Sequence, residues 1–322
     1  MELLSLELAD GTYVDGREYV QLNSALKLSS ESVPLLVLVH GGSYDCDFFD
    51  LDERHSVRQW SERLGVPTVA LNRPGYGRTP AMTKSSDAGS SNSDTETYIQ
   101  RHGRWLNELA LPAVWSHYRK GLSVSSIVLY GSSIGGAVST VTAGLHGRDP
   151  SPGYKLAGLI LSAMGATPNA EPLKPFYAPL RWSSEPLVLP REVQESLAAS
   201  EMASLFDKAI FETDKGRHPT SGQELYDINI EWPTYWRAYA NTVRVQVLYT
   251  LGEVDDLWHV SPSKVHEFVG AFSNAPWVES RLLINAPHVP EFSRQCSGFL
   301  LRVYGFALEC AASLAIQEEK RH

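Results

Sequence analysis

A serine, a carboxylate and a histidine follow three separate apolar segments of this 322-residue chain. The serine, Ser133, lies in the motif Gly131-Ser-Ser-Ile-Gly135, directly after the apolar run 127–130. A hydroxyl becomes a strong nucleophile only when a base removes its proton, and imidazole is well suited to this task near neutral pH. The chemistry to consider first is therefore nucleophilic catalysis by serine.

The Gly-x-Ser-x-Gly pattern predicts a sharp turn from a strand into a helix that exposes the serine oxygen. A residue held at positive φ crowds its neighbours two places away, so Gly131 and Gly135 leave room that a Cβ would fill. The spacing places Ser133 at the expected apex of this turn and gives Ser132 no such position. At the usual glycine frequency the pattern arises by chance in about one chain of this size in ten, so its surroundings have to support it.

The surroundings of this motif alternate between buried strands and helices. This rhythm predicts an α/β fold with a mostly parallel, doubly wound sheet. We expect antiparallel strands at 4–8 and 17–22, and then strands at 34–39, 68–71, 127–130, 156–161, 244–250 and 280–285. Helices are expected at 56–64, 98–118 with an interruption at Pro112, 137–145 and 262–268, and at the end of the chain.

The rhythm changes in residues 165–241, where prolines, short helical candidates at 191–199 and 201–211, and aromatic residues are frequent. This composition predicts a helical lid inserted into a core formed by residues 1–164 and 242–322. The polar stretch 81–97 has almost no apolar residues and predicts a mobile surface loop.

Five motifs in this arrangement together resemble those of the α/β-hydrolase superfamily, in its capped branch that acts on small molecules. The resemblance spans roughly residues 34–308 and implies the α/β-hydrolase fold, in which serine, acid and histidine follow successive strands in this order. The motifs are His40-Gly41-Gly42, Asn72-Arg-Pro-Gly-Tyr-Gly77, Gly131-Ser-Ser-Ile-Gly135, Gly252-Glu-Val-Asp255 and His288.

The resemblance implies a role for each of these residues. Ser133 is the expected nucleophile, His288 the general base, and Asp255 the acid that orients His288. The backbone N–H groups of Ile134 and, by family geometry, of Gly42 are expected to form the oxyanion hole.

The choice of acid has alternatives, because Glu253 and Asp256 lie beside Asp255. The spacing from Gly252 in the family favours Asp255, while a solvated acidic loop would explain all three carboxylates. The segment after the preceding strand, residues 162–169, contains no carboxylate that could take this role.

His288 is chosen for its position after the last strand, although Pro287 replaces the glycine that usually precedes this histidine. His259 lies near Asp255 and Asp256, but one histidine beside two carboxylates is a poor ligand set for a metal. We therefore expect neither a metal nor a cofactor.

Aromatic residues of the insertion favour a bulky apolar or aromatic substrate over a sugar or a peptide. Tyr44, Trp182, Trp232 and Trp236 are the expected substrate contacts, and packing of the lid on the core is an equally good explanation for any one of them. An acidic run after the oxyanion loop would suit a cationic group or be a solvated surface; it comprises Asp45, Asp47, Asp50 and Asp52.

The composition is that of a soluble globular protein, with 43% hydrophobic and 20% charged residues. The formal net charge of -9 argues against nucleic acid as a partner. The odd set Cys46, Cys296 and Cys310 favours a reducing compartment. Neither a signal peptide nor an apolar run of about 18 residues is apparent, so we expect a cytoplasmic protein that does not bind membranes.

These features predict a serine hydrolase that cleaves an ester, lactone, thioester or activated C–C bond of a small molecule through an acyl-enzyme. Two alternatives remain open. The first is a cyclase, lyase or acyl transferase of specialised metabolism on the same fold, since fold alone does not decide the chemistry. The second, which the intact serine, acid and histidine disfavour, is a binding protein without turnover.

Overall fold

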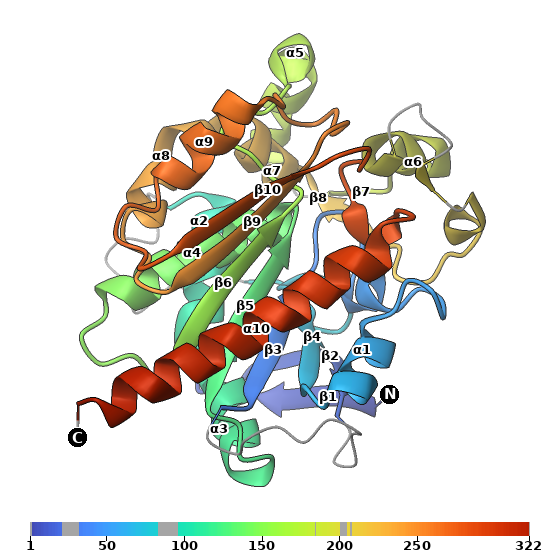
Figure 1. Ribbon diagram of the computed structural model, residues 1–322. Coiled ribbons are helices and arrows are strands. Elements are labelled where there is room, and N and C mark those ends of the chain that lie inside the picture. The colour runs from blue at the N-terminus through green and yellow to red at the C-terminus, as the bar shows by residue number, and fades with distance from the viewer. Residues whose placement is uncertain are drawn as a thin grey trace.

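The computed structural model describes residues 2–20, 32–82, 96–183, 185–199, 205–206 and 208–321. In these residues eight strands form one sheet in the order β1-β2-β4-β3-β5-β6-β9-β10, shown in Figure 1. The pairs β1–β2 and β2–β4 are antiparallel and the others are parallel, which confirms the predicted fold class. The strands are β1 Glu2–Glu7, β2 Tyr13–Tyr19, β3 Pro34–Val39, β4 Thr68–Leu71, β5 Ser126–Ser132, β6 Leu156–Ser162, β9 Gln246–Gly252 and β10 Val278–Leu283.

Every residue of the central strands β3, β5 and β6 is buried, because helices cover both faces of the sheet. Along β3, Leu35 and Val37 pack on one face, whereas Leu36 and Leu38 pack on the other. Figure 1 shows α1 and α10 on one face and α2, α4, α8 and α9 on the opposite face. The helices are α1 Val57–Leu64, α2 Tyr98–Trp105, α3 Leu111–Gly121, α4 Ile134–Arg148, α8 Trp232–Ala240, α9 Pro262–Gly270 and α10 Cys296–Glu319.

In place of the interruption expected at Pro112, a π-helical turn over Leu106–Ala110 joins α2 to α3, so the three segments form one continuous helix. Pro112 lies in the first turn of α3. Proline lacks the N–H that a regular helix would use, and the wider π turn absorbs this mismatch just before it.

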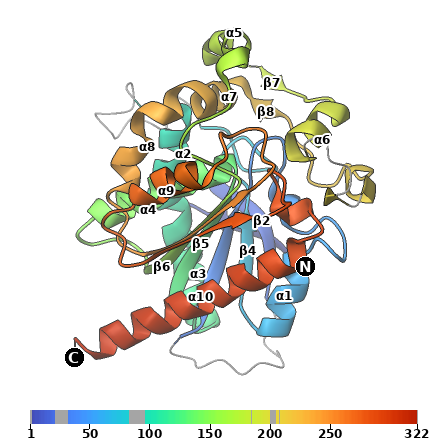
Figure 2. The same ribbon diagram turned by 45° about the horizontal axis from the view of Figure 1, so that its top comes forward.

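The chain between β6 and β9 forms short helices and a small antiparallel ribbon. Figures 1 and 2 show α5, α6 and α7 with this ribbon at one end of the sheet, while α8 lies beside α4. The part of the expected insertion from Trp232 onward therefore packs on the core. The other elements are α5 Lys174–Tyr177, β7 Pro186–Leu187, α6 Arg191–Ala199, β8 Thr220–Ser221 and α7 Gly222–Tyr226.

Three sequence-based expectations fall partly outside the described residues. They concern residues 21–22 of the second strand, residues 83–95 of the polar loop, and residues 201–204 and 207 of a helix expected at 201–211. The last residues of that helix, Lys208–Phe211, form a 3-10 turn.

Helix α10 is the one helix in the described part of the chain whose length and hydropathy would suffice to cross a membrane. Phe299, Val303 and Phe306 are buried, and the helix packs against β3, β5 and β6. This packing on the sheet accounts for the apolar residues on the buried face of the helix (Figure 1).

Candidate active site

Ser133 joins β5 to α4 with φ 53° and ψ −124°, a backbone conformation that residues other than glycine rarely adopt. The chain around it is tightly packed. A Cβ on Gly131 would lie 2.3 Å from the carbonyl oxygen of Gly135, and one on Gly135 would lie 2.2 Å from that of Val39. No side chain fits at either position, so the two glycines permit the turn that presents Ser133.

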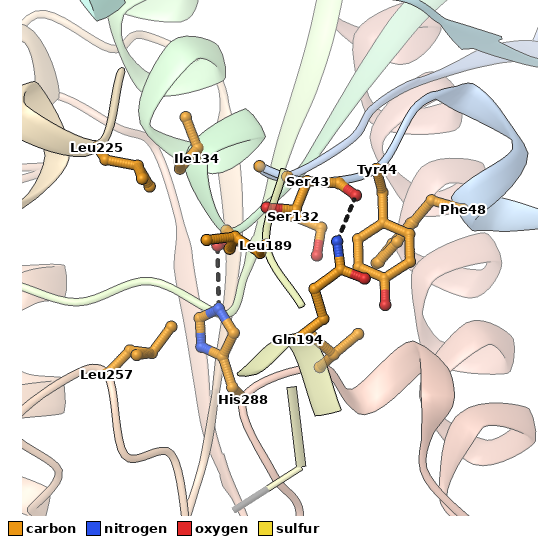
Figure 3. Close-up of a pocket in the computed structure, with 14 residues that line it drawn as sticks. Ser43, Tyr44, Phe48, Ser132, Ile134, Leu189, Gln194, Leu225, Leu257 and His288 are labelled. Carbon is orange, nitrogen blue, oxygen red and sulfur yellow. Dashed lines mark hydrogen bonds between the residues drawn. The ribbon is translucent and has the colours of Figure 1, made fainter. Parts of the chain in front are cut away.

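A chain of hydrogen bonds links Ser133, His288 and Asp255. Ser133 Oγ lies 3.0 Å from His288 Nε2, and His288 Nδ1 lies 2.8 Å from Asp255 Oδ2. The dashed line at His288 in Figure 3 marks the first of these bonds. Because the carboxylate can only accept, Nδ1 carries the hydrogen and Nε2 is free to accept the Ser133 proton. This is the arrangement that general-base activation of a serine requires.

The environment distinguishes Asp255 from its acidic neighbours. Asp255 is buried, and its second oxygen accepts the backbone N–H of Leu257 at 2.9 Å. Glu253 and Asp256 are exposed, and the Glu253 carboxylate accepts the backbone N–H of Asn285 at 2.8 Å. Of these three carboxylates, Asp255 therefore has both the burial and the contact that orient an imidazole.

The loop after β3 lies directly against the turn at Ser133. A Cβ on Gly41 would lie 3.0 Å from the Cβ of Ser133, and one on Gly42 would lie 2.9 Å from Cδ1 of Ile134. Ile134 is the first residue of α4, where free N–H groups and the helix dipole favour negative charge. The two residues expected to donate to an oxyanion, Gly42 and Ile134, thus line the same cavity as Ser133.

This cavity has a volume of about 90 Å³ and is mainly apolar. Its walls come from the loops after β3, β5, β9 and β10 and from the chain between β6 and β9 (Figure 3). The lining residues are Gly41, Gly42, Ser43, Tyr44, Phe48, Ser132, Ser133, Ile134, Leu189, Gln194, Leu225, Leu257, His288 and Val289.

Tyr44 lines this cavity, but the three tryptophans expected to contact substrate are not among its described lining residues. Trp232 and Trp236 are fully buried and stack on each other, and Trp236 also stacks on Phe268 of α9. Trp182 is 80% exposed. The structure therefore corrects the expected role of Trp182, Trp232 and Trp236, because aromatic composition is the same for a packed core and for a binding pocket.

Sequence reasoning missed three cavity residues that the described part of the chain between β6 and β9 supplies, namely Leu189, Gln194 and Leu225. Two are ordinary leucines without a sequence signal. Gln194 is buried, and its Nε2 donates to the carbonyl oxygen of Ser43 at 3.4 Å (Figure 3). That partner fixes the amide orientation and leaves the buried Oε1 without a hydrogen-bond partner among the described residues.

The acidic run after the oxyanion loop serves local structure. Asp47 pairs with Arg17 at 2.7 Å, and Asp45 accepts the backbone N–H of Asp47. Asp50 accepts the hydroxyl of Ser56. None of these carboxylates is among the described lining of the cavity.

Within the described ranges, no three His, Cys, Asp or Glu side chains are grouped so that they could hold a metal ion. The thiols of Cys46, Cys296 and Cys310 are free and buried. Burial raises the pKa of each thiol, which keeps it protonated and a poor nucleophile. None of these three thiols therefore has the surroundings of a reactive nucleophile.

Glu291 is buried close to the turn at Ser133, where it accepts hydrogen bonds from Tyr130 and, at 3.1 Å, from Ser162. Burial raises the pKa of this carboxyl, and the hydrogen bonds offset only part of that effect. A raised folded-state pKa means that stability is full below the unfolded pKa, about 4.3, and is lost as the pH rises through the folded value.

We therefore expect Glu291→Gln to gain stability relative to the wild type as the pH rises from about 4 to 8. Denaturant unfolding at each pH measures this difference. Glu279→Gln is the control, because its hydrogen bond to Arg302 lowers the pKa of Glu279: this variant should lose stability relative to the wild type as the pH rises to about 5 and show no further change up to pH 8. A Glu291→Gln difference that stays constant across this pH range would contradict the prediction.

Comparison with known proteins identifies relatives of this fold. A model of the alpha/beta hydrolase family matches residues 36–297. A search of the curated proteins finds no significant match. Among solved structures, the N-acyl homoserine lactonase AidH, complexed with N-hexanoyl homoserine, is 16% identical with a TM-score of 0.59, covering 96% of this chain and 97% of that one.

Two further structures are similar to the same extent. The E-2-(acetamidomethylene)succinate hydrolase is 14% identical with a TM-score of 0.60, covering 95% of this chain and 99% of that one. A thermophilic esterase from Thermogutta terrifontis is 15% identical with a TM-score of 0.56, covering 97% of this chain and 100% of that one. At these identities the likeness establishes the shared fold.

Proposed function

The chain belongs to the alpha/beta hydrolase family, and from this premise we propose that it is a serine hydrolase. It cleaves an ester, lactone, thioester or activated C–C bond of a small apolar molecule through an acyl-enzyme. The observation that carries this proposal is the hydrogen-bonded chain of Ser133, His288 and Asp255 at a small apolar cavity.

The reaction on an ester proceeds in two halves. Ser133 Oγ attacks the carbonyl carbon while His288 Nε2 takes its proton, and Asp255 stabilises the resulting imidazolium. The N–H groups of Gly42 and Ile134 stabilise the negative oxygen of the tetrahedral intermediate. Collapse expels the alcohol, which receives the proton from His288. Water, activated by the same imidazole, then hydrolyses the acyl-serine and releases the acid.

The chain between β6 and β9 acts as a lid in this proposal. Leu189, Gln194 and Leu225 come from it and contribute to the wall of the cavity. A lid that excludes water strengthens the electrostatic interactions at the reacting carbonyl. The small volume of the cavity, about 90 Å³, supports a short acyl group with the alcohol side directed toward solvent.

We expect p-nitrophenyl acetate and butanoate to be hydrolysed with kcat/KM at least about tenfold higher than the dodecanoate, because the apolar space of about 90 Å³ accommodates a short acyl chain but only part of a dodecanoyl chain. A fluorophosphonate probe should also phosphonylate Ser133 Oγ with loss of HF, which intact-mass measurement detects. A wild-type protein that neither hydrolyses the esters nor reacts with the probe would contradict a serine hydrolase. That outcome would favour the cyclase, lyase or binding-protein alternative.

A further inference from the structure

An ion pair between Arg73 and Glu224 is enclosed in the protein beside the loop that precedes Gly42. Arg73 follows β4 and is 2% exposed, whereas Glu224 lies in α7 and is 0% exposed. Arg73 Nη2 and Glu224 Oε1 are 2.6 Å apart. Charges are rarely buried unless they are paired and have further hydrogen bonds, so the additional partners of this pair indicate what it does.

The additional partners of Arg73 are backbone carbonyls of the oxyanion loop. Its Nε donates to the oxygen of His40 at 3.1 Å, and its Nη2 donates to the oxygen of Gly41 at 2.9 Å. The planar guanidinium therefore holds two consecutive carbonyls in a fixed arrangement. Burial lowers the pKa of Arg73, but Glu224 and nearby groups more than offset this effect, and the guanidinium stays charged.

His40 supplies a second donor to the same Gly41 oxygen. Its Nδ1 lies 2.8 Å from this oxygen, while its Nε2 accepts the backbone N–H of Arg73 at 3.3 Å. A carbonyl oxygen only accepts, so Nδ1 carries the hydrogen and the ring is neutral. Burial, followed by the charge of Arg73, lowers the pKa of His40 and favours this neutral form.

The orientation of the Gly41 carbonyl sets the direction of the Gly42 N–H. These groups belong to one trans peptide, in which C=O and N–H point in opposite directions. When Arg73 and His40 hold the oxygen in the interior, the N–H faces the opposite side, and Gly42 lines the cavity there with Ser133. A peptide between two glycines would otherwise rotate easily, because neither residue restricts its backbone by a Cβ.

Arg73 itself is held by Glu224 of the lid and by Tyr76, which binds the lid. Tyr76 donates to Glu224 Oε2 at 2.8 Å, its hydroxyl is 2.8 Å from Thr220 Oγ1, and Arg73 Cζ lies 4.5 Å from the centre of its ring. Glu224 and Thr220 both belong to the chain between β6 and β9. The lid thus contacts the oxyanion loop through a buried polar network as well as through the cavity wall.

We propose that Arg73 is a positioning residue that directs the Gly42 N–H toward the oxyanion, and that Glu224 of the lid holds Arg73 in this position. This inference rests on the proposed function, because it assigns Gly42 as an oxyanion donor. The lid then has a second task besides enclosing substrate: its Glu224 completes the site in which the transition state is stabilised.

The double variant Arg73→Met/Glu224→Gln tests this role without leaving an uncompensated buried charge. We expect this variant to fold. Its kcat for p-nitrophenyl acetate should be about 10- to 100-fold below that of the wild type, while KM changes by less than about threefold, because the lost interaction acts in the transition state. The affinity for an arylboronic acid, which forms a tetrahedral anion on serine, should fall by the same factor as kcat.

Tyr304→Phe is the matched control, since the hydroxyl of Tyr304 is buried and bonded to Thr68 and Val57, outside the described lining of the cavity. It should lower the unfolding midpoint and leave kcat unchanged.

If the double variant does not fold, Arg73→Lys is tested in its place. Lysine keeps the charge but lacks the planar guanidinium that contacts two carbonyls, so kcat should fall while KM is retained.

The outcomes separate this inference from the proposed function. A folded double variant, or a folded Arg73→Lys in its place, with kcat and boronic acid affinity within about twofold of the wild type would overturn the inference while leaving the hydrolase proposal intact. A wild type without ester hydrolysis and without fluorophosphonate labelling would overturn the proposed function itself.

Discussion

Replacement of Ser133 by alanine is expected to lower kcat for ester hydrolysis by about a million-fold, because the covalent route through an acyl-enzyme is lost. Folding should be retained, since the change removes only the hydroxyl and its hydrogen bond to His288. Steady-state hydrolysis of p-nitrophenyl acetate measures the rate, and intact-mass measurement after fluorophosphonate treatment should find no adduct.

The neighbouring hydroxyl provides a matched control for this change. Ser132 ends β5 and also lines the cavity, but the hydrogen bond to His288 comes from Ser133. Ser132→Ala should therefore keep kcat within about tenfold of the wild type and still react with the probe. Loss of labelling in Ser132→Ala, with labelling retained in Ser133→Ala, would identify Ser132 as the nucleophile and contradict the assignment to Ser133.

His288→Ala should resemble Ser133→Ala, because the serine cannot lose its proton efficiently without the imidazole. The double variant should be about as slow as either single variant, since residues that act as a unit show non-additive effects. Multiplicative losses in the double variant would indicate that Ser133 and His288 act independently, contrary to their 3.0 Å contact.

The sheet could be predicted because its central strands are continuous apolar runs. β3 is apolar throughout and buried on both faces, so its composition alone identifies it. The ends of β9 and β10 differ by two residues from the expected ranges 244–250 and 280–285, since parallel pairing of Val247 with Val278 fixes them rather than composition.

Part of the site could be predicted because its residues occupy fixed places relative to strands. Ser133, Asp255 and His288 follow β5, β9 and β10, so the parallel sheet brings them to one end. The cavity wall could not be predicted, because Leu189 and Gln194 come from short elements whose position depends on tertiary contacts. Likewise, Arg73 and Glu224 are far apart in sequence, and their pairing becomes apparent only in the folded chain.

Asp255→Asn is expected to lower kcat by about four orders of magnitude while the fold and substrate binding are retained. The asparagine Oδ1 can still accept the N–H of Leu257, so its NH₂ group faces His288 and donates to Nδ1. The imidazole must then carry its hydrogen on Nε2, where it can no longer accept the proton of Ser133. Ester hydrolysis and a thermal unfolding midpoint together measure this effect.

The exposed neighbours make this experiment decisive for the choice of acid. Glu253→Gln and Asp256→Asn remove the same charge from the same loop, so long-range electrostatics change to a similar extent in all three variants. If Asp255 acts through its 2.8 Å contact with His288, the Glu253→Gln and Asp256→Asn variants should have kcat within about threefold of the wild type, because exposed charges interact weakly across water. A large loss in Asp256→Asn, with an active Asp255→Asn, would transfer the orienting role to Asp256 and require the loop after β9 to rearrange during turnover.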